Sequence, residues 1–190
     1  MHRETELQKL RACLDNSLNT FVYGEPGIGK TSLVKCAIKD YKGKAIYIDC
    51  SLYQTLNAVL REILSSVSSL MASRSNYDLL KRLKEKSKNS KIAIVLDHFD
   101  YLKEVDTVNK LLGLGFNLVI MSDKQESYLK LDPFARSSIT NLVAVSVYTV
   151  EQTTVIVSDR AKDALKEWSY TDATIKKVCE QSKGNIALAI

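Results

Sequence analysis

The chain alternates between short, nearly continuous apolar segments and longer segments in which apolar residues recur every three or four positions. The short segments are typical of strands buried on both faces of a parallel sheet, and the longer ones of helices packed on one side. The expected strands are 21–23, 45–50, 91–97, 116–121 and 142–147. The expected helices among them are 4–17, 30–40, 53–68 and 76–87. This alternation predicts a three-layer α/β sandwich around a five-stranded parallel sheet.

The pattern changes after residue 148. Thr149 and Gln152 have the spacing of a capping box, which predicts a helix that begins there and continues to about Trp168. A second helix is expected over 172–182, with Gly184 as its C-terminal cap. We therefore divide the chain into a core, residues 1–148, and the start of a helical subdomain, residues 149–190.

Composition narrows the class of protein. The chain has 190 residues, of which 45% are hydrophobic and 26% charged, and no apolar run approaches the ~20 residues that span a bilayer. The charged N-terminus lacks a signal-peptide core, so we expect a cytoplasmic protein, or a nuclear one in a eukaryote. Four scattered cysteines without a CxxC pair favour reduced thiols over a zinc site. The net charge of +5 permits contact with nucleic acid, although the dense basic stretch 81–91 fits a solvated helix face better than a phosphate-binding patch.

The strongest chemical signal is YGEPGIGKTS, residues 23–32. It matches the phosphate-binding pattern G-x-x-x-x-G-K-[ST], between an expected strand and an expected helix. The alternative is a glycine-rich turn that matches the pattern by chance, and such a turn would not be expected to lie between a strand and a helix. Such a loop turns backbone N–H groups towards an anion at the positive end of the helix. We therefore expect ATP or ADP to be bound by Gly24, Glu25, Pro26, Gly27, Ile28, Gly29, Lys30, Thr31 and Ser32.

Asp97 ends the third expected strand, and the carboxyl ends of parallel strands face the ligand crevice. Lys30 would then reach the β- and γ-phosphates, while Thr31 and Asp97 would hold Mg²⁺. An aspartate that merely caps the next turn is the alternative interpretation. Many nucleoside triphosphatases have a glutamate directly after this aspartate, but here His98 follows. We therefore assign candidate catalytic roles to Lys30, Asp97 and His98 and leave open whether the chain hydrolyses ATP.

Several segments together resemble the AAA+ initiator ATPases of archaeal and eukaryotic DNA replication, the origin-recognition and cell-division-control proteins. HRETELQKL is similar to the family's motif near the adenine, which implies a binding role for Arg3. YGEPGIGKTS is similar to its Walker A segment and IVLDHFDYL to its Walker B segment. Two further segments distinguish this family better than Walker A, which many families share. They are LDPFARSSI and YTVEQTTVIVSDRAKDAL, and the second resembles the start of the family's helical lid. The resemblance implies ATP, Mg²⁺, other AAA+ subunits or replication proteins, and duplex DNA as partners.

The sequence departs from this family where hydrolysis is usually supported. His98 replaces the Walker B glutamate, Ser122 falls where a sensor-1 asparagine is usual, and Ala187 where a sensor-2 arginine is usual. Phe134 and Ser138 occupy positions where members of the family can present an arginine finger, and Arg136 lies between them. The sequence ends inside the lid, so we expect no winged-helix DNA-binding domain within it and only weak DNA binding.

Loss of several groups that act on one transition state predicts a nucleotide binder with slow or absent turnover. Such a chain would act as a nucleotide switch or an assembly subunit. Two alternatives stay open at this point: an unrelated P-loop signalling or plasmid-maintenance ATPase, and a pseudo-ATPase scaffold. An initiator-like lid should place Arg160 towards the nucleotide or the core, which distinguishes an initiator-like protein from an unrelated P-loop ATPase.

Overall fold

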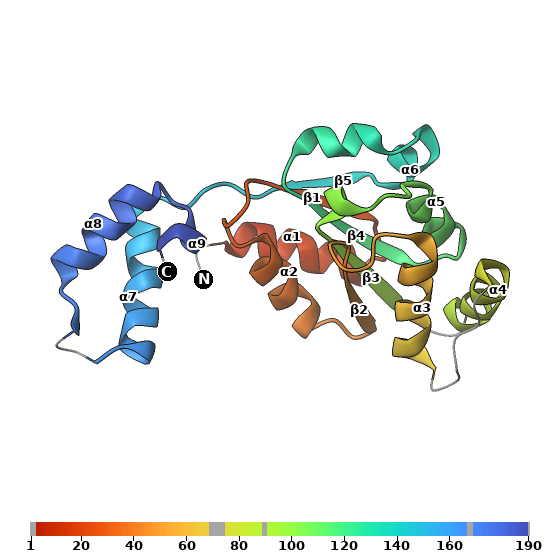
Figure 1. The fold of residues 1–190 in the computed structure, drawn as a ribbon, viewed down its shortest axis with the longest axis horizontal. Helices are drawn as coiled ribbons and strands as arrows, with labels where there is room; N and C mark the ends of the chain where they lie inside the picture. The colour runs from red at the N-terminus through yellow and green to blue at the C-terminus, as the bar shows by residue number, and fades with distance from the viewer. Residues whose placement is uncertain (1–2, 69–74, 89–90, 167–168, 190) are drawn as a thin grey trace.

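A computed structural model describes residues 3–68, 75–88, 91–166 and 169–189. Its centre is a five-stranded, fully parallel sheet with the strand order β2-β3-β4-β1-β5 (Figure 1). The strands are β1 (Thr20–Tyr23), β2 (Lys44–Asp49), β3 (Ile92–Asp97), β4 (Asn117–Ser122) and β5 (Asn141–Ala144). The predicted fold class is confirmed.

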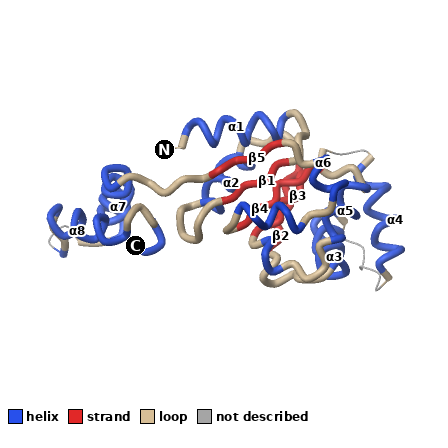
Figure 2. The backbone as a smooth tube through the Cα atoms, turned by 90° about the horizontal axis from the view of Figure 1, so that it is seen from above, coloured by secondary structure: helices blue, strands red, loops and turns tan. Residues whose placement is uncertain are grey.

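Helices cover both faces of the sheet and complete the three layers (Figures 1 and 2). One face packs against α1 (Glu4–Asp15) and α2 (Lys30–Lys39). The other packs against α3 (Leu56–Val67), α4 (Asn76–Ser87), α5 (Asp106–Gly113) and α6 (Pro133–Ser138). Strand β3 shows why its sequence is apolar throughout: all its residues are buried, with Ala93 and Val95 facing α1 and α2, and Ile94 and Leu96 facing the opposite layer.

Three further helices lie beside the sandwich, joined to it by an extended segment after β5 (Figures 1 and 2). They are α7 (Val150–Ala164), α8 (Asp172–Ser182) and α9 (Ile186–Ala189). Helix α7 begins in the predicted Thr149–Gln152 capping box. It ends at Ala164, earlier than predicted, and Trp168 lies outside the described residues. The boundary near residue 148 stays a prediction.

The turn after α8 explains one glycine of the sequence. Lys183 caps the helix in the left-handed conformation, and Gly184 follows with φ 83°. A Cβ on Gly184 would lie 2.0 Å from the carbonyl oxygen of Tyr148, so the chain there leaves no room for a side chain. The glycine thus permits close contact between this turn and the segment that leads from the core.

Some elements differ from the sequence-based expectation. Strand β5 ends at Ala144 rather than 147, because it is an edge strand that pairs only with the four residues of β1. Helices α5, α6 and α9 were not predicted, nor were two 3-10 helices: η1 (Phe99–Tyr101) and η2 (Gln125–Lys130). No helix in the described ranges has the length and apolar character needed to cross a membrane.

Candidate nucleotide site

The loop between β1 and α2 forms a cradle at the carboxyl edge of the sheet. Gly24, Gly27 and Gly29 have φ angles of 154°, 81° and 94°. A Cβ on Gly24 would lie 2.3 Å from the carbonyl oxygen of Val145, so the loop can follow its path only with glycine there. Helix α2 has Gly29 as its N-cap and no side chain bonded to its first turn. The first N–H groups of α2 are therefore oriented to bind an anion.

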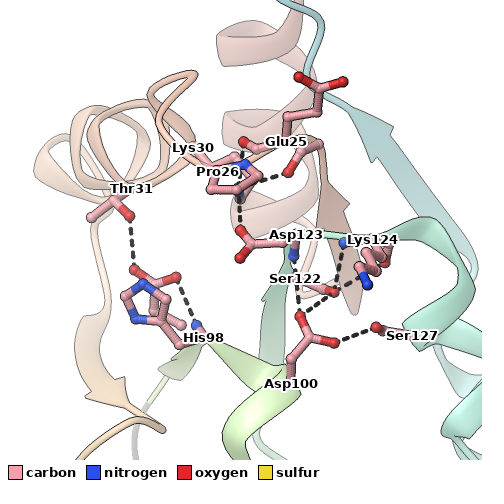
Figure 3. A network of polar contacts seen from close by, with 12 residues as sticks. Glu25, Pro26, Lys30, Thr31, His98, Asp100, Ser122, Asp123, Lys124 and Ser127 are labelled. Atoms are coloured by element: carbon pink, nitrogen blue, oxygen red, sulfur yellow. Dashed lines mark hydrogen bonds and ion pairs between the residues drawn. The ribbon is translucent and has the colours of Figure 1, made fainter. Parts of the chain in front are cut away.

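Lys30 turns back across this loop. Its Nζ donates to the carbonyl oxygens of Gly24 at 2.7 Å and Glu25 at 2.9 Å. It also forms an ion pair with Asp123 at 2.7 Å (Figure 3). Asp123 was not predicted as a site residue; its place directly after an apolar strand in the sheet was the signal that could have identified it.

Thr31 and Asp97 lie together, as a shared metal would require. The Thr31 hydroxyl donates to Asp97 Oδ2 at 2.8 Å, and Asp97 is buried. Tyr47, on the neighbouring strand β2, donates to the same carboxylate oxygen. Burial, together with this hydrogen bond, raises the pKa of Tyr47, so the phenol keeps its proton and can donate. Tyr47 was not predicted as a site residue, although the alternation of β2 places it beside Asp97.

His98 sits at the rim and is held from two sides. Its backbone is left-handed, with φ 52°, and its N–H donates to Asp97 Oδ1 at 2.8 Å. Its ring Nδ1 lies 3.1 Å from Asp49 Oδ1, at the end of β2. Burial alone would raise the pKa of Asp49, but hydrogen bonds from Ser51 and the contact with His98 lower it below its ordinary value. An ionised carboxylate can only accept a hydrogen bond, so in this contact His98 donates from Nδ1 to Asp49.

The carboxylate of Asp100 binds residues at the end of the neighbouring strand, β4, and just after it. Its oxygens accept hydrogen bonds from the side chains of Ser122 and Ser127 and from the backbone N–H of Asp123 (Figure 3). Burial opposes ionisation, but these bonds lower the pKa of Asp100. The Ser122 hydroxyl is thus bonded to Asp100. The residue of this segment that lines the nucleotide cavity is Asp123.

The lid contacts the phosphate loop through α9 and the turn before it. Asn185 Nδ2 donates to the carbonyl oxygen of Pro26 at 2.9 Å, and the N–H of Ala187 donates to that of Gly27 at 3.1 Å. Ala187 lines the cavity, at the position where an arginine is usual in the similar family, and brings no charge. Arg160 of α7 also lines the cavity, which is the placement expected of an initiator-like lid.

Arg3 packs against the phosphate loop. It is 4% exposed and donates to the carbonyl oxygens of Ile28 and Ser146. Its guanidinium carbon is 4.0 Å from the centre of the Tyr148 ring, a cation–π contact. Arg3 therefore ties the phosphate loop to the segment that leads to the lid, and direct contact with a base stays a prediction. His2, from the same motif, lies outside the described residues.

Phe134, Arg136 and Ser138 all lie on α6, and none lines the nucleotide cavity. In the assemblies that the resemblance implies, an arginine finger acts on the nucleotide site of a neighbouring subunit. The position of α6 in a single chain therefore leaves the role of Arg136 a prediction.

The cavity has a volume of about 270 Å³ and is enclosed by the phosphate loop, the ends of β3 and β4, and the lid. Its residues fit a nucleoside phosphate with Mg²⁺. The glycine cradle and first turn of α2 suit the phosphates, and Thr31 and Asp97 supply the oxygen ligands that Mg²⁺ prefers. Within the described ranges no three His, Cys, Asp or Glu side chains cluster as a metal site, so a metal here would need the phosphates as further ligands.

A family model described as the AAA ATPase domain matches residues 1–120, which include the phosphate loop, β2 and β3 with Asp97. The chain belongs to this family. Nucleotide binding is therefore a property of its family as well as of its geometry. No curated protein sequence matches the chain.

Several solved structures share the fold of this AAA ATPase domain. Cdc6p from Pyrobaculum aerophilum has a TM-score of 0.81 and 26% identity, over 99% of this chain. ORC2 from Aeropyrum pernix, solved as ADPNP–ADP complexes, has a TM-score of 0.81 and 17% identity, over 98%. A Walker-type ATPase of Pyrococcus abyssi has a lower TM-score of 0.67 and 19% identity, over 99%. The chain spans 59% of the length of each of the first two and 65% of the third.

Proposed function

We propose that this chain is an ATP-binding AAA+ protein of the replication-initiator type that hydrolyses ATP slowly and acts as a nucleotide-dependent switch or assembly subunit. In this proposal Lys30 binds the phosphates, Thr31 and Asp97 hold Mg²⁺, and the loop residues 24–32 surround the phosphate chain. The lid, residues 149–190, closes over the site through Arg160 and the turn that follows α8.

One observation carries the proposal: the residues expected to bind the phosphates and Mg²⁺ are present at the cavity, whereas two residues that usually promote hydrolysis in the similar family are replaced. Lys30, Thr31 and Asp97 all line the cavity. His98, beside Asp97, stands in place of an acid, and Ala187 of the lid stands in place of an arginine. Binding depends on the first group, and stabilisation of the transition state on the second.

The likeness to Cdc6p and ORC2 supports the initiator type over an unrelated P-loop ATPase, because their TM-scores exceed that of the Walker-type ATPase. The lid supports it as well, since Arg160 lies at the cavity. Other AAA+ subunits or replication proteins are the protein partners that this proposal implies.

Identification of the nucleotide that co-purifies with the protein tests the proposal. The protein is washed free of unbound nucleotide, denatured, and its supernatant separated by ion-exchange chromatography. We expect ADP or ATP in near-stoichiometric amount, because the intact phosphate loop holds the nucleotide and ATP is hydrolysed slowly. A site that stays empty after incubation with excess ATP and Mg²⁺ would instead support a scaffold without nucleotide.

We expect duplex DNA to bind this chain weakly and with a strong dependence on salt. The net charge of +5 provides attraction to phosphates that salt screens, and it reads no base sequence. A fluorescence-anisotropy titration at several salt concentrations measures both properties. Nanomolar, sequence-specific binding at physiological salt would contradict this expectation and indicate a base-reading element. Residues 69–77 are the candidate segment; of these, 69–74 lie outside the described residues.

A further inference from the structure

Asp123 follows β4 and lines the nucleotide cavity beside Lys30. We propose that Asp123 sets the preference of this site between nucleoside diphosphates and triphosphates, because its carboxylate competes with the terminal phosphate for the Lys30 ammonium. The inference rests on the proposed nucleotide binding and deepens it: the resting site favours the diphosphate.

The contacts of Lys30 leave no spare donor. A lysine ammonium has three N–H groups. Here they meet the carbonyl oxygens of Gly24 and Glu25 and one carboxylate oxygen of Asp123, at 2.7, 2.9 and 2.7 Å. The Lys30 side chain is only 8% exposed and that of Asp123 is 35% exposed, so water screens the ion pair only from the Asp123 side. A phosphate oxygen that binds Lys30 must therefore displace one of these partners, and Asp123 is the anion among them.

Asp123 is also held in place. Its backbone N–H donates to Asp100 Oδ2 at 3.1 Å, and the Ser122 hydroxyl donates to the same oxygen at 2.7 Å (Figure 3). The Lys124 N–H in turn donates to the Ser122 hydroxyl oxygen at 3.1 Å. These bonds fix the backbone on both sides of Asp123, and its carboxylate accepts a hydrogen bond from Lys30. The position of Asp123 beside Lys30 thus follows from how strand β4 ends.

The charges of the cavity make the terminal phosphate the one most affected. Lys30 and Arg160 are its cationic side chains, and Asp97 and Asp123 its fixed anionic ones. Mg²⁺ would offset Asp97, whereas Lys30 is the only cationic side chain bonded to Asp123 among the residues that the structure describes. The backbone of the loop and the N-terminus of α2 can hold an inner phosphate without Lys30. A terminal phosphate depends on Lys30 and meets the Asp123 carboxylate there, where like charges repel more strongly than in water.

Asp123→Asn tests this inference, since the amide keeps the shape and an oxygen acceptor for Lys30 but removes the charge. Isothermal titration calorimetry with Mg²⁺ measures the Kd of ADP and of the non-hydrolysable ADPNP, so hydrolysis has no part in the readout. We expect wild-type protein to bind ADP more tightly than ADPNP. The variant should bind ADPNP about tenfold more tightly than wild type, and ADP less than about threefold more tightly, a tenfold change corresponding to about 1.4 kcal/mol. Glu126→Gln, an exposed acid three residues further on, is the matched control and should change neither value.

The outcomes separate this inference from the proposed function. Equal changes for ADP and ADPNP in Asp123→Asn, or no change in either, would overturn the inference while nucleotide binding stands. Wild-type protein that binds neither nucleotide would overturn the proposed function, and the inference with it. Asp123→Ser serves as a second variant, and it should shift the ADPNP-to-ADP ratio in the same direction if the asparagine variant does not fold.

Discussion

Replacement of Lys30 by alanine should weaken ATP binding at least tenfold. The substitution removes the ammonium that we expect to bind the phosphates, and a hydrogen bond to a charged group contributes about 1.5–3 kcal/mol. It also leaves Asp123 without its partner beside the incoming phosphates. Calorimetric titration with ADPNP and Mg²⁺ measures the change. Lys39→Ala, which removes the same charge from the exposed end of helix α2, should leave the affinity near that of wild type.

A double substitution makes the Lys30 prediction sharper. If Asp123 competes with the phosphate, Lys30→Ala combined with Asp123→Asn should bind ADPNP more tightly than Lys30→Ala alone, because the unpaired carboxylate is gone. Such coupling is expected for residues in direct contact. An unchanged affinity in Lys30→Ala would show that the nucleotide binds elsewhere and would contradict the assignment of this loop.

Restoration of an acid at position 98 should raise ATP turnover. Glutamate there would supply a fixed negative acceptor for the attacking water, a role for which general bases typically contribute about 10²–10⁴-fold. We expect a smaller gain, about tenfold, because Ala187 still brings no charge to the transition state. Steady-state phosphate release, at saturating ATP and Mg²⁺, measures the change.

The contact with Asp49 decides how this variant is best made. His98 Nδ1 lies 3.1 Å from Asp49 Oδ1, so His98→Glu alone would bring two carboxylates together and raise the pKa of one of them. His98→Glu combined with Asp49→Asn removes that repulsion, since the amide can donate to the new acid. Asp49→Asn alone is the control, which adds no acid and should not raise turnover. Failure of the double variant to exceed wild type would place the limit on hydrolysis elsewhere than at His98.

Much of the sandwich could be predicted because its signals are local. The strand at Ile92–Asp97 is apolar throughout, since both of its faces are buried, and the lid helix begins at the predicted Thr149. Helices α5 and α6 were missed. They are only eight and six residues long, too short for a helical period to stand out from the flanking loops.

The strand–loop–helix geometry around the phosphate loop could also be predicted, because a continuous stretch of sequence encodes it. The remaining contacts depend on which strands become neighbours. Tyr47 reaches Asp97 because β2 and β3 pair in register, and Asp123 reaches Lys30 because β4 lies between β3 and β1. Neither relation is visible before the strand order is known. The resemblance placed Ser122 where a sensor-1 asparagine is usual; its side chain bonds Asp100, and the aspartate that lines the cavity is the next residue.

A single-turnover measurement on the wild-type protein tests the central claim most directly. Protein in excess over radiolabelled ATP, with Mg²⁺, is quenched at intervals, and bound ATP is separated from released phosphate. We expect ATP to bind but to be converted more slowly than about 0.01 s⁻¹, well below the 1–10³ s⁻¹ of typical enzymes. Bound ATP that is converted at about 1 s⁻¹ or faster, with His98→Ala equally fast, would contradict it.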